Sequence, residues 1–152
     1  MFLVFGQDQT IIPWALHHLG RDAPREGFGP AVTIGIAADF EGLVAAAVYH
    51  NARDHDIGLT FCATTPLWAT KGNIAAIFRY PFGQLGVERV TCLTRKSNKR
   101  ARKLMKGLGF QHEGTHRKGW HGIETACSYG LLAEDCKWVE ESDGRQGRQE
   151  TA

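Results

Sequence analysis

The segment from residue 90 to residue 114, VTCLTRKSNKRARKLMKGLGFQHEG, places the tightest constraint on the fold of this chain. Its first residues alternate between two faces and are rich in β-branched side chains, which favours a strand. The Ser-Asn pair at 97–98 then offers a side-chain oxygen as a helix N-cap, and apolar residues follow at the spacing of one helical face. Gly107 and Gly109 end that helix before a further apolar run. The segment therefore predicts a strand, a helix and a second strand.

The rest of the chain also alternates between strand and helix patterns. Pro81 lies inside the second helical pattern and predicts a kink or an early end of that helix. A strand, a helix and a strand in succession imply a right-handed crossover between parallel strands. We expect strands over 1–5, 31–38, 42–49, 57–64, 88–94, 110–120 and 125–132, helices over 9–19 and 70–85, a loop over 20–30, and a helical turn within 133–139.

Composition bounds the class of protein. A chain of 152 residues with 43% hydrophobic residues suits one domain with one core. The net charge of +2 does not demand a nucleic-acid partner. The four cysteines lack C-x-x-C spacing and lie mostly in apolar surroundings, which favours reduced, buried thiols in a cytoplasmic protein. No opening signal region and no apolar run long enough to span a bilayer is present, so we expect no membrane association.

The segment 90–114 carries a motif beyond general α/β patterning. Asn98, Ala101, Leu108-Gly109-Phe110 and Glu113-Gly114 match the pattern Asn-x-x-Ala, helix, Leu-Gly-Phe, x-x-Glu-Gly. This half of the chain resembles the GNAT acyl-CoA N-acyltransferases. The resemblance is specific over 88–114 and loose before it.

The resemblance implies both a fold and an activity. The fold is an α/β domain over 1–139 with a mixed, centrally splayed β-sheet of about six to seven strands flanked by helices. The activity is transfer of an acetyl group from acetyl-CoA to a primary amine by direct attack. A protein N-terminus, a lysine and a small-molecule amine all stay open as acceptors, and family members often form homodimers. The polar segment 140–152 is expected to be a disordered tail.

A phosphate-binding loop is expected between the fourth strand and the second helix. Free backbone N–H groups at a helix N-terminus can hold a diphosphate. The family pattern there is Gln/Arg-x-x-Gly-x-Gly/Ala, and this chain departs from it with Ala69 and Ile74. Taken alone, the loop reads as an ordinary helix entry, and only its position relative to the 98–110 motif favours a phosphate site. The candidate residues are Thr70, Lys71, Gly72 and Asn73.

The resemblance also places the pantetheine arm between the splayed strands 57–64 and 88–94, where it pairs as an additional strand would. A backbone N–H there would polarise the thioester carbonyl. Asn98 matches the family residue that contacts this arm, besides its role as a helix cap. Arg95, Lys99 or Arg100 can steer the phosphates of CoA. The strand residues expected to contact the cofactor are Phe61, Cys62, Ala63 and Thr64.

The catalytic acid of the family pattern is not present at its usual position. Many GNAT proteins place a Tyr acid seven residues after the motif Asn, but here the position holds Met105, which cannot donate a proton. Asn98 and Tyr129 are therefore the candidate catalytic residues, although Tyr129 also matches a tyrosine that is often structural. Proximity alone, or a water relay, can also suffice. Base candidates bordering the central strands are Glu41, His50, Asp54, His55 and Asp56.

Two other functions compete with acetyl transfer. Residues 112–116 read His-Glu-Gly-Thr-His, the H-E-x-x-H motif of zinc hydrolases, which needs a helix. The glycines in and around this motif favour an extended chain instead. The basic residues over 95–106 could bind nucleic acid or CoA in a non-catalytic GNAT-like protein, although a solvated helix face also explains them.

Overall fold

A computed structural model describes residues 1–139, so the predicted tail at 140–152 lies outside the described part of the chain. The strands form one mixed sheet in the order β1-β2-β3-β4-β5-β7-β6. The neighbours β4 and β5 are parallel and all other neighbours are antiparallel, as the crossover predicted. The strands are β1 (Phe2–Phe5), β2 (Ala31–Ala38), β3 (Gly42–His50), β4 (Asp56–Ala63), β5 (Arg89–Arg95), β6 (Gln111–Trp120) and β7 (Glu124–Leu132).

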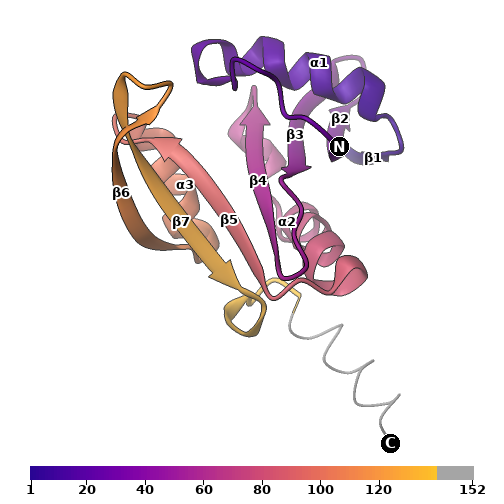
Figure 1. The fold of residues 1–152 in the computed structure, drawn as a ribbon. Coiled ribbons are helices and arrows are strands. Elements are labelled where there is room, and N and C mark those ends of the chain that lie inside the picture. Colours follow the sequence, from indigo (N-terminus) through magenta and orange to yellow (C-terminus); the bar gives the residue numbers. More distant parts are fainter. Residues whose placement is uncertain (140–152) are drawn as a thin grey trace, which may run out of the picture.

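Helices cover both faces of the sheet (Figure 1). Helix α1 (Asp8–Leu19) packs on the face formed by β2, β3 and β4, and its Ile11 and Ala15 are fully buried there. Helices α2 (Lys71–Phe78) and α3 (Lys99–Leu108) lie on the opposite face. Their apolar sides bury against the larger of two hydrophobic clusters, so the sheet carries a core on each face.

Helix α3 begins and ends as the sequence predicts. The Asn98 side-chain oxygen accepts the N–H of Ala101 at 3.1 Å, which makes Asn98 the N-cap. Gly109 ends the helix with φ of +103°, a conformation that favours glycine. The following turn leads directly into β6, which pairs with β7 at the edge of the sheet.

The second helix ends earlier than the expected range of 70–85. Regular α-helix stops at Phe78, and residues Arg79–Leu85 continue as wider π-helical turns. Pro81 explains the change, because proline lacks the N–H that an α-helical turn needs and its ring crowds the preceding turn. Short 3₁₀ turns also occur at Gly20–Asp22 in the predicted loop, at Pro66–Trp68 and at Ala133–Asp135.

All four cysteines are buried, and Cys62, Cys92 and Cys127 are free thiols, in agreement with the reduced thiols expected from the sequence. Within residues 1–139, none of the helices is long and apolar enough to cross a membrane. The predicted α/β sheet of six to seven strands flanked by helices is confirmed, with seven strands.

Candidate functional site

The sheet is split along its centre. Strands β4 and β5 start side by side and then diverge, so that the two halves of the sheet form a V (Figure 1). Beyond the last pair, each strand leaves backbone groups on its inner edge without a neighbouring strand, which is the arrangement that an extended ligand can complete. The paired residues are Asp56↔Arg89, Ile57↔Val90 and Gly58↔Thr91.

Polar side chains hold the closed end of the V together. The Thr91 hydroxyl donates to Asp56 across the β4–β5 junction at 2.8 Å and accepts from Arg89 Nε at 2.9 Å. The same Arg89 guanidinium forms a two-pronged ion pair with Glu113 of β6, which lowers the pKa of that carboxyl. Gly130 makes room for this pair, since a Cβ there would clash with the Glu113 carboxylate. The network therefore links three strands, β4, β5 and β6, at the base of the split.

A long groove of about 680 Å³ runs between β4, the loop after it, and helix α3. Its volume lies in the range typical of small-molecule sites. Ile74 of α2, the residue that departs from the family pattern, is buried in the core and forms part of the groove wall rather than filling the groove. The groove brings together five of the residues predicted to bind the cofactor: Phe61, Cys62, Ala63, Asn98 and Arg100.

The predicted phosphate-binding residues form the entry to helix α2, next to the groove residue Ala69. The Thr70 hydroxyl accepts the N–H of Asn73 at 3.2 Å and so caps the helix. The N–H groups of Lys71 and Gly72 belong to the first turn, where no intrahelical acceptor exists. A Cβ at Gly72 would meet no protein atom within 4 Å, so the surface there is open.

Thr64 lies apart from these residues. Its N–H and its hydroxyl both donate to the Val44 carbonyl, at 2.9 and 3.2 Å, so they face β3 rather than the split. The Thr64 N–H is therefore not among the backbone donors that the predicted cofactor could pair with.

A small cavity of about 80 Å³ lies in the opening between the diverging strands. Thr60 of β4 and Thr94 of β5 line it from either side, and Asn98 and Met105 line it from helix α3. Within the described chain, the buried Thr94 hydroxyl has no hydrogen-bond partner. The side chains of this cavity are therefore placed to contact a group inserted between the strands.

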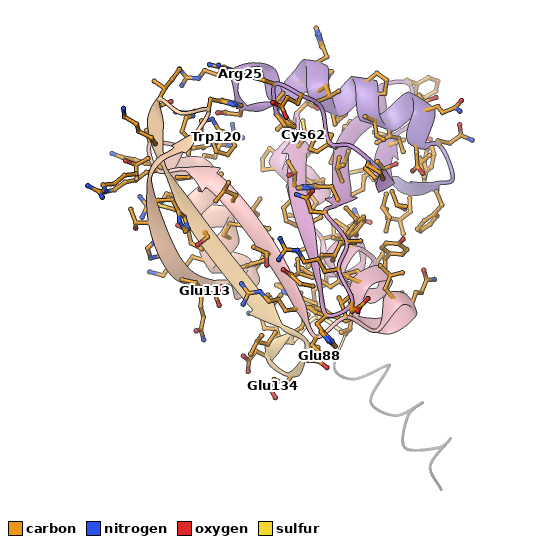
Figure 2. All side chains as sticks on the ribbon, in the orientation of Figure 1. Arg25, Cys62, Glu88, Glu113, Trp120 and Glu134 are labelled. Carbon is orange, nitrogen blue, oxygen red and sulfur yellow. The ribbon has the colours of Figure 1, made fainter. Side chains whose placement is uncertain are left out.

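A second hollow, of about 510 Å³, opens on the α1 side of the split. Its walls are the 22–28 loop and the tip of the β6–β7 hairpin, which Figure 2 shows at the open end of the V through the labelled Arg25 and Trp120. Thr60 and Leu93 line this hollow as well as the 80 Å³ cavity, so the two spaces meet at these residues. The meeting of this loop with the hairpin tip in one wall could not be predicted from the sequence, because the two segments are distant in the chain.

An ion pair joins the loop wall to β5. Arg95 Nε donates to Asp22 Oδ1 at 2.7 Å and Nη2 to Oδ2 at 3.3 Å, while Nη1 donates to Ser97 at 2.6 Å. The Arg95 side chain is only 9% exposed. Arg95, which the sequence suggested as a guide for CoA phosphates, therefore anchors the wall between the two spaces instead.

His50, at the end of β3, lies in the wall of the second hollow. Its Nε2 is 2.9 Å from the Thr60 hydroxyl and its Nδ1 is 3.1 Å from the Asn51 side-chain amide. The Phe28 ring packs 5.3 Å from the imidazole, centroid to centroid. Burial lowers the pKa of His50 below its usual 6.5, so the imidazole is neutral at pH 7.

The other base candidates lie elsewhere. Asp56 is engaged at the closed end of the V by Thr91 and Arg89. His55 is exposed and 3.9 Å from Glu88. Glu41 and Asp54 line none of the spaces described above.

Tyr129, the second candidate catalytic residue, is not in the groove. Its hydroxyl accepts from Arg102 Nε at 2.9 Å, and its side chain lines a separate hollow of about 550 Å³ on the other flank of α3. A role for Tyr129 in positioning α3 fits this contact, whereas it has no access to the split between β4 and β5. The remaining side chains of this hollow are Lys99, Arg102, Lys103, Lys106, Phe110 and His112.

The zinc-hydrolase alternative fails on secondary structure. The His-Glu-Gly-Thr-His segment lies in strand β6, not in a helix. His112 contacts the Tyr129 ring, whereas His116 lies 2.9 Å from the hydroxyl of Ser128, whose side chain projects from the opposite face of β7. Among residues 1–139, no group of three or more His, Cys, Asp or Glu side chains is placed to hold a metal ion.

Comparisons with known proteins agree with this architecture. No protein-family model and no curated protein matches the sequence. Among solved structures, the fold matches ribosomal-protein-S5-alanine acetyltransferase from Vibrio fischeri with a TM-score of 0.68 and 16% identity, over 90% of this chain and 93% of that one.

Two further matches come from other acetyltransferases. A GNAT-family acetyltransferase from Bacillus anthracis has a TM-score of 0.54 and 22% identity, over 67% of this chain and 66% of that one. A spermidine N-acetyltransferase variant from Vibrio cholerae has a TM-score of 0.60 and 15% identity, over 75% and 71%. The chain therefore has the fold of the GNAT N-acetyltransferases.

Proposed function

We propose that this protein is an N-acetyltransferase that moves an acetyl group from acetyl-CoA to a primary amine. The observation that carries the proposal is the split between β4 and β5, because it joins a groove along helix α3 to a second hollow at the 22–28 loop. With a thioester in the split, the CoA part would lie in the groove. The amine would approach from the 510 Å³ hollow, which is called the acceptor hollow below. A protein N-terminus, a lysine and a small amine remain the acceptor classes.

Direct attack by the amine fits the side chains around the split. Burial raises the pKa of the Cys62 thiol to about 11, so this groove residue is a neutral thiol at pH 7 and a poor nucleophile for an acetyl-enzyme intermediate. The inner edge of β4 beyond Gly58 can offer a backbone N–H to the thioester oxygen. Asn98 and Arg100 of α3 line the groove and can contact the pantetheine arm and the phosphates.

A thermal-shift titration with acetyl-CoA and with CoA tests the proposal. A ligand at a hundredfold over its dissociation constant should stabilise the protein by about 2.7 kcal/mol. An amine panel with free-thiol detection then tests transfer, using an alanine-led peptide, a lysine peptide and spermidine. No shift at millimolar acetyl-CoA would contradict the proposal.

Substitution at Gly72 provides a sharper test of the cofactor site. Since a Cβ at Gly72 meets no protein atom within 4 Å, Gly72→Leu should fold as the wild type does. Leucine at the first turn of α2 would obstruct a diphosphate, so the dissociation constant of CoA should rise at least about tenfold. Gly72→Ala is the matched control, and equal affinity of both variants and the wild type would remove the phosphates from this helix end.

A second candidate function is binding without catalysis. The 550 Å³ hollow on the outer flank of α3 is lined by four basic residues and no acidic one. Such a surface favours a phosphate backbone. Tight binding of duplex DNA or RNA with a steep salt dependence, together with no response to acetyl-CoA, would favour this function over acetyl transfer.

A further inference from the structure

The amine acceptor of an acetyltransferase arrives protonated at neutral pH, so the site needs a group that takes its proton. Such a group must touch the acceptor hollow, reach the junction with the thioester and carry no proton of its own at pH 7. Within the described chain, four residues line both the cavity between the strands and the acceptor hollow: Asp22, Thr60, Leu93 and Trp120. Asp22 is held in the ion pair with Arg95. Leu93 is apolar, and the Trp120 indole N–H can only donate. Of the four, the Thr60 hydroxyl is therefore the group that can both accept a proton and pass one on.

We infer that Thr60 and His50 form a proton relay, in which the Thr60 hydroxyl contacts the acceptor amine and His50 receives the proton through it. This inference rests on the proposed acetyl transfer. The ammonium gives a proton to Thr60 Oγ1 while the Thr60 hydroxyl proton passes to His50 Nε2, which leaves a neutral amine and an imidazolium. The amine then forms the C–N bond as the C–S bond breaks, its surplus proton goes to the departing sulfur, and His50 returns its proton to solvent.

The glycine at position 58 leaves space for the His50 imidazole. His50 pairs with Gly58, the last β4 residue in register with β5, and a Cβ at Gly58 would lie 3.0 Å from His50 Cε1. Glycine there admits the ring beside the point where the strands part. Thr60, two residues further along β4, projects from the same face as Gly58 and therefore meets Nε2 at 2.9 Å.

Asn51 sets the direction of the relay. Its φ of +53° turns the chain so that its side-chain amide faces His50 Nδ1. With the amide nitrogen toward Nδ1, the ring proton sits on Nε2 and is donated to Thr60. When the amide turns by 180°, its oxygen accepts a hydrogen bond from Nδ1–H, and Nε2 becomes the acceptor of the Thr60 hydroxyl proton. Both arrangements keep the ring neutral, and the second is the one that takes a proton.

The charges facing His50 leave burial as the dominant influence on its protonation. Asp22, across the hollow, is held by Arg95. The remaining charged side chains of the wall, Arg25 and Glu26, are exposed and opposite in sign, and His121 is the other titratable group. The lowered pKa of His50 therefore supports its role as a proton acceptor, because the imidazole is unprotonated at pH 7.

The test compares His50→Gln, Thr60→Val and Thr60→Ser, using whichever amine of the panel the wild type acetylates fastest. Loss of a general base lowers kcat by about 10²–10⁴-fold, and we expect at least the lower figure for His50→Gln. Thr60→Val should lose about tenfold or more, and Thr60→Ser should recover most of the rate because it keeps the hydroxyl. Acetyl-CoA affinity should be unchanged in all three, since the thermal shift reports the cofactor groove.

The pH profile separates a proton role from a structural one. Wild-type kcat/KM should fall as the pH drops through the pKa of His50, below 6.5, and this acid limb should be missing in His50→Gln. His55→Gln, the same change at an exposed histidine outside the hollow, is the matched control and should keep both rate and limb. A histidine NMR titration should place the His50 pKa below the ordinary 6.5.

Each outcome decides between the claims. If His50→Gln or Thr60→Val keeps the wild-type rate and acid limb, the relay is wrong while acetyl transfer stands. If NMR places the His50 pKa at or above its ordinary value, the relay is also wrong. If the wild type binds acetyl-CoA but acetylates no amine of the panel, the proposed function is wrong, and the relay is then wrong as well.

Discussion

The ion pair between Asp22 and Arg95 allows one prediction to be worked through in detail. Asp22→Asn keeps the size of the side chain and removes its charge. The Arg95 guanidinium then stays 9% exposed beside a neutral amide, and the charge-assisted hydrogen bonds at 2.7 and 3.3 Å are weakened or lost. The 22–28 loop loses its main attachment to β5 at the wall of the acceptor hollow.

Two observations set the size of the effect. Removing one partner of a fully buried pair costs about 3–5 kcal/mol, and a hydrogen bond to a charged group contributes about 1.5–3 kcal/mol. Asp22 is 23% exposed and Glu124 remains 4.0 Å from Arg95, so part of the charge stays compensated. We therefore expect the free energy of unfolding to fall by about 2 kcal/mol, which lowers the melting temperature by about 4–8 °C for a chain of this length.

Urea unfolding of four proteins measures this value: wild type, Asp22→Asn, Arg95→Met and the double variant. The cycle should give a coupling energy of about 1–2 kcal/mol, as expected for residues in direct contact. Glu124→Gln is the control, because its carboxylate is 47% exposed and should contribute less than about 0.5 kcal/mol. If Asp22→Asn unfolds like Glu124→Gln, the ion pair does not hold the loop and the reasoning is wrong.

Three further predictions follow from the same contacts. Asn98→Ala should destabilise by about 1 kcal/mol in urea unfolding through loss of the cap on α3, and should weaken acetyl-CoA binding, whereas Asn98→Asp should keep the cap. Gly58→Ala should cost about 1–3 kcal/mol, because its Cβ would lie 3.0 Å from the His50 carbonyl oxygen, and a changed His50 NMR signal would report the displaced ring. The lowered pKa of Glu113 means that its pairing with Arg89 stabilises the fold above about pH 4.5 and is lost as the pH falls through the lowered pKa. Glu113→Gln should therefore unfold more easily than the wild type at pH 7 but equally in strong acid; a gap that persists in acid would assign the effect to packing.

Local patterns were sufficient to predict most of the fold. Asn98 and Gly109 act within one or two turns of helix α3, so their roles as cap and terminator are readable from neighbouring residues. The early end of α2 at Phe78 agrees with one of the two outcomes that Pro81 predicted, a kink or an early end. The wider turns that follow were not predicted, because proline in a helix does not specify them. The apolar runs at 31–38 and 42–49 predicted β2 and β3 to within one residue, because these strands are buried on both faces and their ends are marked by polar turns.

The site was only partly accessible to sequence reasoning. The groove residues Phe61 to Ala63 follow from their strand and its partner, but Thr64 turns toward β3, where the Val44 carbonyl takes its N–H. The Tyr129 side chain of β7 is buried and its hydroxyl contacts Arg102 of α3. This contact depends on where α3 lies on the sheet. Trp120 and the 22–28 loop meet only through tertiary folding, so no local signal could have placed them in one wall.

The short pairing between β4 and β5 also affects how firmly the two halves of the sheet are held together. Strands β1 to β4 with α1 form one block and β5 to β7 with α3 another, and the sheet is continuous between them over only three residue pairs. An extended ligand that pairs with both inner edges would act as the missing strand of the sheet. Amide hydrogen exchange at Leu59 to Phe61 and at Cys92 to Thr94 should therefore slow together on binding. The reason is that a ligand in the split would also hold the two blocks together.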